Sequence, residues 1–421
     1  MNKKNKTYLK QTTNAVAKIL ILILIVMILL TAVGISSLFI SLSGTDEIFL
    51  WLPWIGGIIF CSYLSMCLFR VKDKTYRNKF FFKGLAFFVL IVIGLNAFMF
   101  FKNKIDVVDE KGDNGVDIKQ YLPFESGSKV VKLDEKSTLK INDNLPKLDG
   151  ALALYPVYAA FVQAVYPSQK YVVDDSNNPF GRESSIDMVL EYNDDDPFVC
   201  SNTANAYKRL IIGNADMIFA AGPSKEQIEM AKEKGKEFHL TPIGKEAFVF
   251  FVNSRNPINN LSIQEVKDIY GGKINNWSTV GGKNRKIRAF QRPTNSGSQT
   301  TLLKFMGNSP LIEPEKKDVP AGMGGMISEV ASYKNYGNAI GFSFLYYTTE
   351  MVNDKKIKIL SLNGVEPNKE NIRNGKYPLF SNFYIVTTDS KNPNVKKFTE
   401  WILSPQGQEI IEKTGYIPLT D

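Results

Sequence analysis

The residues best suited to chemistry in this chain lie in one short stretch around Arg292. An apolar alternating run from Ile287 precedes this arginine, and the small polar run Asn295–Ser298 separates it from a helical pattern that continues to Phe305. We expect a strand that passes into a helix here, which leaves backbone N–H groups free at the helix N-terminus. These N–H groups, the positive end of the helix dipole and one guanidinium form a pocket for a small anion.

Two other stretches offer a second wall for such a pocket. The glycine turn at Asp149–Pro156 leads into a helical pattern over Val157–Val165, although by itself it is better explained as an ordinary strand-to-helix turn. The tripeptide ending at Thr203 precedes a helical pattern that closes at Gly213. Thr203 either caps this helix or turns its hydroxyl to a ligand at the same helix end, and the spacing alone leaves both open.

The elements around these loops alternate between apolar strands and amphipathic helices from Leu148 onward. Such alternation is typical of an α/β fold with largely parallel sheets. The apolar and periodic segments predict strands at 215–221, 246–252, 339–344 and 382–387, and helices at 224–236, 261–270 and 393–403.

Three apolar runs precede this domain, at residues 19–40, 48–69 and 81–101. Each has about the 20 residues that a helix needs to cross a bilayer. Basic residues precede the first run and crowd the loop between the second and third, whereas the first loop carries only acidic charges. The positive-inside rule then predicts a multi-pass membrane anchor. In this topology residues 1–18 are a cytoplasmic tail, 102–146 an extracellular linker and 147–421 an extracellular binding domain.

The charge distribution argues against a nucleic-acid-binding protein, although the net charge is +9. Residues 1–104 hold thirteen Lys and Arg against three Asp and Glu, an excess of ten, so the rest of the chain is close to neutral. His239 is the only histidine, which leaves no partner for a His-based metal site or a Ser-His-Asp triad. We therefore predict no metal, no cofactor and no enzyme activity, and a phosphate-ester hydrolase is the least favoured alternative.

Several stretches in combination resemble the substrate-binding proteins of phosphate-specific ABC transporters. They are IGKEAFVFFVNSRNPINNLSIQEVKDIYGGKINNW, RPTNSGSQT, NAIGFSF and WILSPQGQEII. The resemblance covers roughly residues 148–419 and leaves out the three apolar runs, since typical members are secreted or lipid-anchored. It implies the two-lobed type II periplasmic-binding-protein fold, an α/β fold, with one lobe at 147–243 and 345–421 and the other at 244–344.

The resemblance also implies which residues bind phosphate. The arginine of the family falls on Arg292, and its Ser-Gly-Ser/Thr trio falls on Ser296, Gly297 and Ser298. The hydroxyl residue that heads the earlier helix falls on Thr203. These positions agree with those chosen from residue types and spacing.

Two positions depart from the family pattern. The first loop usually offers Ser or Thr at the places of Ala151 and Leu152, so here only backbone N–H groups, at Leu152 and Ala153, are expected to donate. In some members a carboxylate follows the strand that ends here at Ala221, and it accepts the proton of hydrogenphosphate. This chain has no carboxylate there, so other tetrahedral oxyanions are expected to bind as well, unless another acceptor enters the site from elsewhere in the chain.

The sequence therefore predicts a membrane-anchored extracellular protein that captures phosphate, or a similar oxyanion, by lobe closure. An ABC-transporter permease in the membrane is the partner that the resemblance implies. The alternative is a membrane-tethered sensor that reports anion occupancy through its three helices, without a transport role.

Overall fold

The computed structural model describes residues 52–70, 73–106, 116–168, 197–315, 318–320, 322–332 and 337–419, together with single positions between 16 and 34. It divides into two compact units, Met1–Val107 and Val108–Asp421, which are described separately.

The described part of the first unit contains two helices, α2 (Leu52–Arg70) and α3 (Lys74–Asp106), which cover most of the second and third apolar runs. They pack through the stacked rings of Phe60 and Phe88, whose centroids are 4.6 Å apart. Within the described ranges, no helix combines the length and the apolar character that a bilayer crossing requires. The first run lies outside these ranges except for single positions, so the structure does not support the three-span anchor, which stays a prediction from the sequence.

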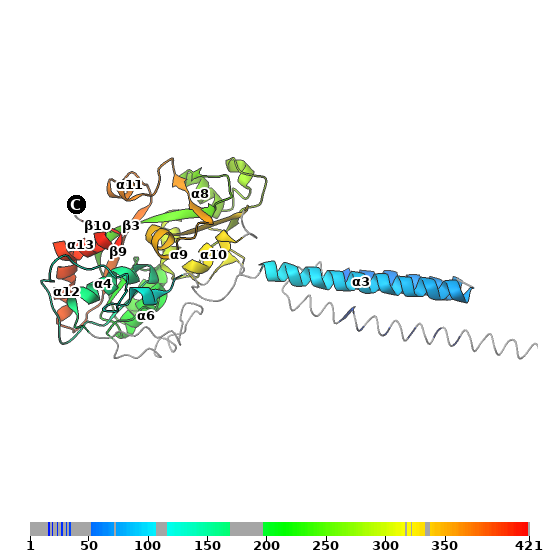
Figure 1. Ribbon diagram of the computed structural model, residues 1–421, viewed down its shortest axis with the longest axis horizontal. Coiled ribbons are helices and arrows are strands. Elements are labelled where there is room, and N and C mark those ends of the chain that lie inside the picture. Colours follow the sequence, from blue (N-terminus) through cyan, green and yellow to red (C-terminus); the bar gives the residue numbers. More distant parts are fainter. Residues whose placement is uncertain are drawn as a thin grey trace, which may run out of the picture. The chain divides into compact units, whose positions relative to one another are not determined.

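The second unit is organised around one long strand, β3 (His239–Asn253), which is shared by two lobes (Figure 1). The first part of β3 pairs antiparallel with β9 (Phe380–Thr387), and its second part pairs antiparallel with β6 (Ala339–Phe344). The strand is fully buried from Ala247 to Val252, as its continuous apolar sequence predicts. The connection between the lobes is therefore a strand and not a flexible linker.

The first lobe carries the sheet order β1-β2-β9-β3. The pair β1–β2 is parallel and the pair β2–β9 is antiparallel, so the sheet is mixed, where the sequence predicted largely parallel sheets. Its remaining elements are β1 (Leu148–Gly150), η3 (Leu152–Leu154), α4 (Tyr155–Val165), α6 (Thr203–Ile212), β2 (Met217–Ala220), α7 (Lys225–Glu233), α12 (Asn394–Leu403), α13 (Pro405–Thr414) and β10 (Ile417–Pro418).

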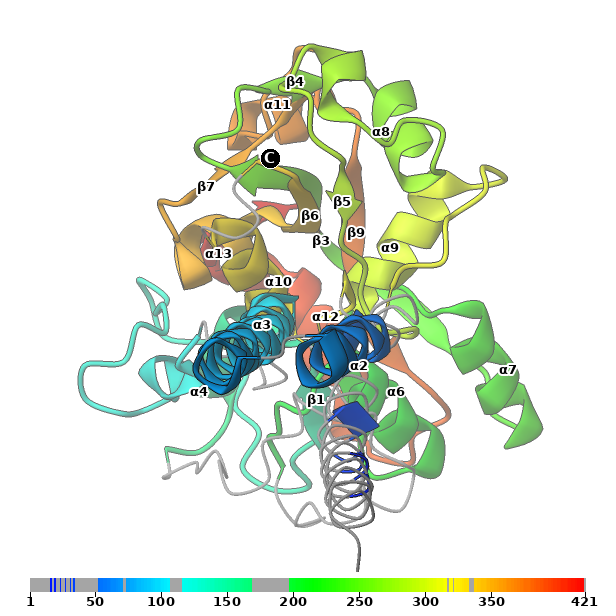
Figure 2. The same cartoon turned by 90° about the vertical axis from the view of Figure 1, so that its right-hand side faces the viewer.

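The second lobe contains the second part of β3 together with β6, β5 and β7, and Figure 2 shows its elements gathered above those of the first lobe. The strand β7 pairs with Phe251–Asn253, although the predicted division assigned residues 345–421 to the first lobe. A three-residue strand is too short to be recognised by its alternation. The other elements of this lobe are β4 (Asn260–Leu261), α8 (Ile263–Tyr270), η5 (Trp277–Val280), β5 (Arg288–Ala289), α9 (Gly297–Met306), α10 (Met323–Ala331), η7 (Tyr347–Val352), β7 (Ile357–Ile359), β8 (Ser361–Leu362) and α11 (Lys369–Arg373).

Residues 116–146, which were predicted to belong to a linker, pack onto the domain. They begin with the short helix η2 (Ile118–Tyr121), and the side chains of Ile118, Tyr121, Val130 and Ile141 are buried in the core. Polar residues separate these apolar positions at irregular intervals, so no sequence pattern indicates that they belong to a core.

Candidate anion-binding site

The stretch around Arg292 forms the predicted passage from strand to helix. The strand β5 leads through a loop into α9, which begins at Gly297 with Ser296 as its N-cap residue. The Ser296 hydroxyl oxygen accepts a hydrogen bond from the Gln299 N–H at 3.3 Å. The other N–H groups of the first helical turn have no partner within the helix, as at any helix start.

The side chain of Ser298 is the strongest sign of a ligand in this loop. It is 2% exposed, and its hydroxyl has no hydrogen-bond partner among the described residues. A buried hydroxyl without a partner costs about 1–3 kcal/mol, so such groups are rare unless a ligand or water satisfies them. Ser298 lies in the first turn of α9, where the helix dipole favours an anion.

The loop before α9 is held in place by Gln299. Its amide oxygen accepts a hydrogen bond from the backbone N–H of Arg292 at 2.9 Å, and its amide nitrogen donates to the side-chain oxygen of Gln291 at 2.9 Å. The Nε and Nη1 atoms of Arg292 are buried. The half-buried arginine is thus supported through its backbone, and two of the three nitrogen atoms of its guanidinium are buried.

Thr203 comes from the first lobe, at the start of α6. The N-cap of this helix is Asn202, whose Oδ1 accepts a hydrogen bond from the Asn205 N–H at 2.9 Å, so capping is not the role of Thr203. Asn202 has φ 137° and ψ 171°, a conformation that glycine adopts far more readily. This strained residue immediately precedes the hydroxyl that the sequence assigned to the ligand.

The two lobes meet at Gly297. A Cβ atom at this position would lie 3.1 Å from Thr203 Oγ1 and 3.5 Å from the Cβ of Ala221. Gly297 belongs to the second lobe and the other two residues to the first, so the cleft is closed here. Because glycine has no side chain, the helix start can approach the opposite wall this closely.

The loop between β1 and α4 completes the wall on the first lobe. It forms the short helix η3, whose N-cap residue Ala151 makes no side-chain hydrogen bond. Leu152 and Ala153 are the first residues of this helix, so their N–H groups have no partner within it. The preceding Gly150 packs so tightly that an added Cβ would lie 2.6 Å from the Phe219 carbonyl oxygen, which fixes the position of the loop.

A small cavity of about 20 Å³ lies at this wall, which is room for about one water molecule. Of the predicted ligand residues, Ala153 and Thr203 line it, next to Ala221. Arg292 and Ser298 are not among its lining residues, and the contact at Gly297 brings their loop to the same place from the other lobe.

One buried carboxylate supports both loops of the first lobe. Asp149 Oδ1 accepts hydrogen bonds from the N–H groups of Gly150 and Ser201 at 2.7 and 2.8 Å. Asp149 Oδ2 accepts the Ser201 hydroxyl at 2.7 Å and pairs with Arg209 Nε at 3.2 Å. The side chains of Asp149 and Arg209 are 0% and 1% exposed, so this ion pair is a buried part of the scaffold behind the site.

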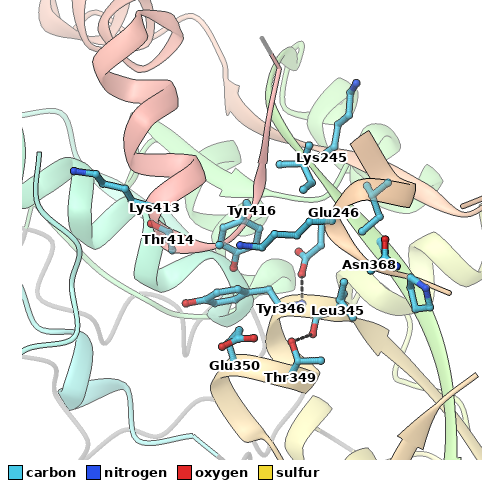
Figure 3. A pocket seen from close by; sticks show the side chains of 16 residues that line it. Lys245, Glu246, Leu345, Tyr346, Thr349, Glu350, Asn368, Lys413, Thr414 and Tyr416 are labelled. Atoms are coloured by element: carbon cyan, nitrogen blue, oxygen red, sulfur yellow. Dashed lines mark hydrogen bonds between the residues drawn. The ribbon is translucent and has the colours of Figure 1, made fainter. Parts of the chain in front are cut away.

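A second cavity, of about 460 Å³, is lined by residues of β3, the segment around Tyr346 and the end of α13 (Figure 3). Glu246 lines both this cavity and the small one at the first wall. Its Oε1 accepts the Tyr346 N–H at 2.8 Å, and burial raises the pKa of Glu246 to about 8. Tyr346 packs against Tyr416, with ring centroids 4.4 Å apart, and the Tyr416 hydroxyl donates to the carbonyl of Ala153.

The sequence interpretation missed the supporting charges Asp149, Arg209 and Glu246. Arg209 lies three residues after the buried Ala206 and just before the buried Leu210, so its place on the apolar face of α6 could have been noticed. The other two stand among apolar residues in strands, where a charge is unusual. Their partners, however, come from distant segments that no local pattern indicates.

A family model described as the PBP superfamily domain matches residues 154–406. The phosphate-binding protein PstS of Bacillus subtilis is 31% identical over 213 residues, which cover 50% of this chain and 65% of that protein. The chain thus spans slightly less than two thirds of this relative. Protein SphX of Synechococcus elongatus is 25% identical over 298 residues, which cover 65% of this chain and 86% of that protein.

Solved structures are similar as well. One is a putative phosphate ABC transporter substrate-binding protein with bound phosphate from Clostridium perfringens, at 21% identity and a TM-score of 0.47. The comparison covers 67% of this chain and all of that chain.

Proposed function

The chain belongs to the PBP superfamily, and we propose that it captures inorganic phosphate, or a similar oxyanion, between its two lobes for an ABC-type uptake system. It is a binding protein and not an enzyme. Relatives with 31% and 28% identity, from Bacillus subtilis and Borreliella burgdorferi, are named phosphate-binding proteins. The observation that carries the proposal within this structure is the buried Ser298 hydroxyl, at the α9 N-terminus and beside the closed contact of the lobes, which has no hydrogen-bond partner in the described part of the chain.

Each predicted residue has a role in this proposal. Arg292 supplies positive charge and a bidentate fork for two anion oxygens. The hydroxyls of Ser296, Ser298 and Thr203 donate hydrogen bonds. In the first loop, where the side chains are apolar, the donors are the backbone N–H groups of Leu152 and Ala153, and on the second lobe the Gly297 backbone approaches the anion without a Cβ.

The proposed donors recognise the negative charge of an oxyanion but discriminate little between different oxyanions. The position that would reject sulfate in related sites is Ala221, which has no side-chain acceptor. We therefore expect sulfate and arsenate to bind in addition to phosphate, with affinities closer together than in a site that has a carboxylate there.

Calorimetric titration of the full-length protein with phosphate, arsenate and sulfate tests the proposal. Arg292→Ala is expected to weaken phosphate binding by about 1.5–3 kcal/mol, or roughly 10- to 150-fold, since one charged hydrogen-bonding group is lost. Arg255→Ala, which removes an exposed arginine after β3, serves as the control and should leave the affinity unchanged. Absence of binding for all three oxyanions would reject the proposal.

We also propose, from the charge pattern of the sequence, that residues 19–101 hold the binding domain at the outer face of the cell membrane. Alkaline extraction of isolated membranes measures this directly, because a protein with spanning helices stays in the pellet. Release into the supernatant would reject the anchor. Crosslinking in cells then decides between uptake and sensing, since an uptake role requires a permease among the captured partners.

A further inference from the structure

Asn295, the residue before the N-cap of α9, makes three hydrogen bonds to the first turn of α7. Its Oδ1 accepts the Ser224 hydroxyl at 2.6 Å, and its Nδ2 donates to Glu226 Oε2 at 2.8 Å. Its backbone carbonyl accepts the Gln227 side-chain amide at 3.3 Å. Asn295 belongs to the second lobe and α7 to the first, so all three bonds cross between the lobes.

The first turn of α7, on the first lobe, is held in place by bonds within that lobe. Ser224 and Gln227 form a complete capping box at the start of α7. The Ser224 hydroxyl accepts the Gln227 N–H at 3.0 Å, and the Gln227 side-chain oxygen accepts the Ser224 N–H at 2.9 Å. The hydroxyl hydrogen of Ser224 and the amide nitrogen of Gln227 stay available as donors, and both donate to Asn295.

The backbone conformation of Asn295, on the second lobe, also favours these bonds. Asn295 has φ 68°, a left-handed conformation that asparagine tolerates better than most residues with a side chain. This conformation turns the chain into α9, and Ser296, Gly297 and Ser298 follow directly. A bond that holds Asn295 therefore also holds the loop to which the anion site is assigned.

We infer that Asn295 and the first turn of α7 form a latch between the lobes, which holds the cleft closed and slows release of the bound anion. The identity of the ligand rests on the proposed function, whereas the latch itself consists only of this chain. Its bonds form only when the lobes are together, so they stabilise the closed state relative to the open one. The latch acts on the closed state, so its loss should change dissociation far more than association.

The main test uses Asn295→Gly in the full-length protein. Glycine keeps the left-handed backbone and removes the two side-chain hydrogen bonds. We expect the dissociation rate of phosphate, measured by stopped-flow fluorescence, to rise about 3- to 30-fold with little change in the association rate. Asn353→Gly is the matched control, because it makes the same exchange at another left-handed asparagine, φ 49°, at the end of η7.

Two further measurements test the latch. In the Asn295→Gly background, Glu226→Ala should have no additional effect on dissociation, whereas additive effects would show that the two residues act independently. When no anion is present, the distance between labels on the two lobes should show that a larger fraction of molecules is open for Asn295→Gly than for wild type. Equal dissociation rates and equal open fractions would overturn the latch. If no oxyanion binds to the wild type, the proposed function fails, and the open fraction without ligand still decides on the latch.

Discussion

Replacement of Gly297 by alanine tests the closed geometry of the cleft with a single methyl group. The new Cβ would lie 3.1 Å from Thr203 Oγ1, closer than ordinary van der Waals contact, and 3.5 Å from the Cβ of Ala221. Both neighbours are on the opposite lobe, so the strain arises only on closure. An overpacked contact costs about 1–3 kcal/mol, which corresponds to roughly 5- to 150-fold weaker anion binding. The separate lobes should fold at least as well as before, because alanine is favoured over glycine in a helix by up to about 1 kcal/mol.

The assay combines calorimetric titration with phosphate and thermal unfolding without ligand. The expected result is weaker binding with an unchanged or slightly higher melting temperature. Gly325→Ala is the control, since a Cβ there would meet only the Cβ of Pro320, at 3.4 Å. In a Thr203→Ala background, Gly297→Ala should cost less, because the closest atom is gone. Wild-type affinity for Gly297→Ala, or the same cost with and without Thr203, would refute the closed contact.

Two further substitutions examine buried polar groups. Ser298→Ala should weaken phosphate binding without destabilising the free protein, because no described residue bonds to the lost hydroxyl and would be left unsatisfied. Calorimetry measures the binding and thermal unfolding the stability, and a large loss of stability would contradict the assignment. Glu246 has an ordinary pKa of 4.5 and a folded-state pKa of about 8, so the folded protein keeps the proton longer and stability falls as the pH rises from about 4.5 to about 8. Glu246→Gln should abolish this decline, which amounts to about 1.4 kcal/mol per unit of pKa shift. Urea unfolding at pH 5 and pH 9 measures it. The same change in unfolding free energy between the two pH values for wild type and Glu246→Gln would count against the prediction.

Much of the binding loop was accessible from the sequence because its determinants are local. Alternation before Arg292, a small polar run and a helical period define β5, the loop and α9 without reference to other segments. The same holds for α6, where a polar tripeptide and Gly213 mark the two ends. The strand at 246–252 was also predicted, although the prediction did not include the first part of β3, residues 239–245.

The parts that escaped prediction depend on contacts between distant segments. The cap of α6 is Asn202 and not Thr203, a choice that the buried Asp149–Ser201 hydrogen bonds help to impose. The polar bonds of Asn295 to α7 become visible only when both lobes are placed. Packing of residues 116–146 rests on isolated apolar side chains, which lack the periodicity that a sequence pattern needs.

The hydrogen bond from Tyr416 to the Ala153 carbonyl has a consequence for biosynthesis. The two residues are 263 positions apart, and β10, which follows Tyr416, pairs with β3 at Lys245 and Gly244. Contacts over such separations form late, because a long loop must be closed before they contribute. The loop with the proposed backbone donors Leu152 and Ala153 is thus made early, but the bond to its Ala153 carbonyl forms only after residue 416 has been synthesised. A truncated chain that lacks this segment should therefore lose the Tyr416 bond, and the proposed anion site would be complete only in the last stage of synthesis.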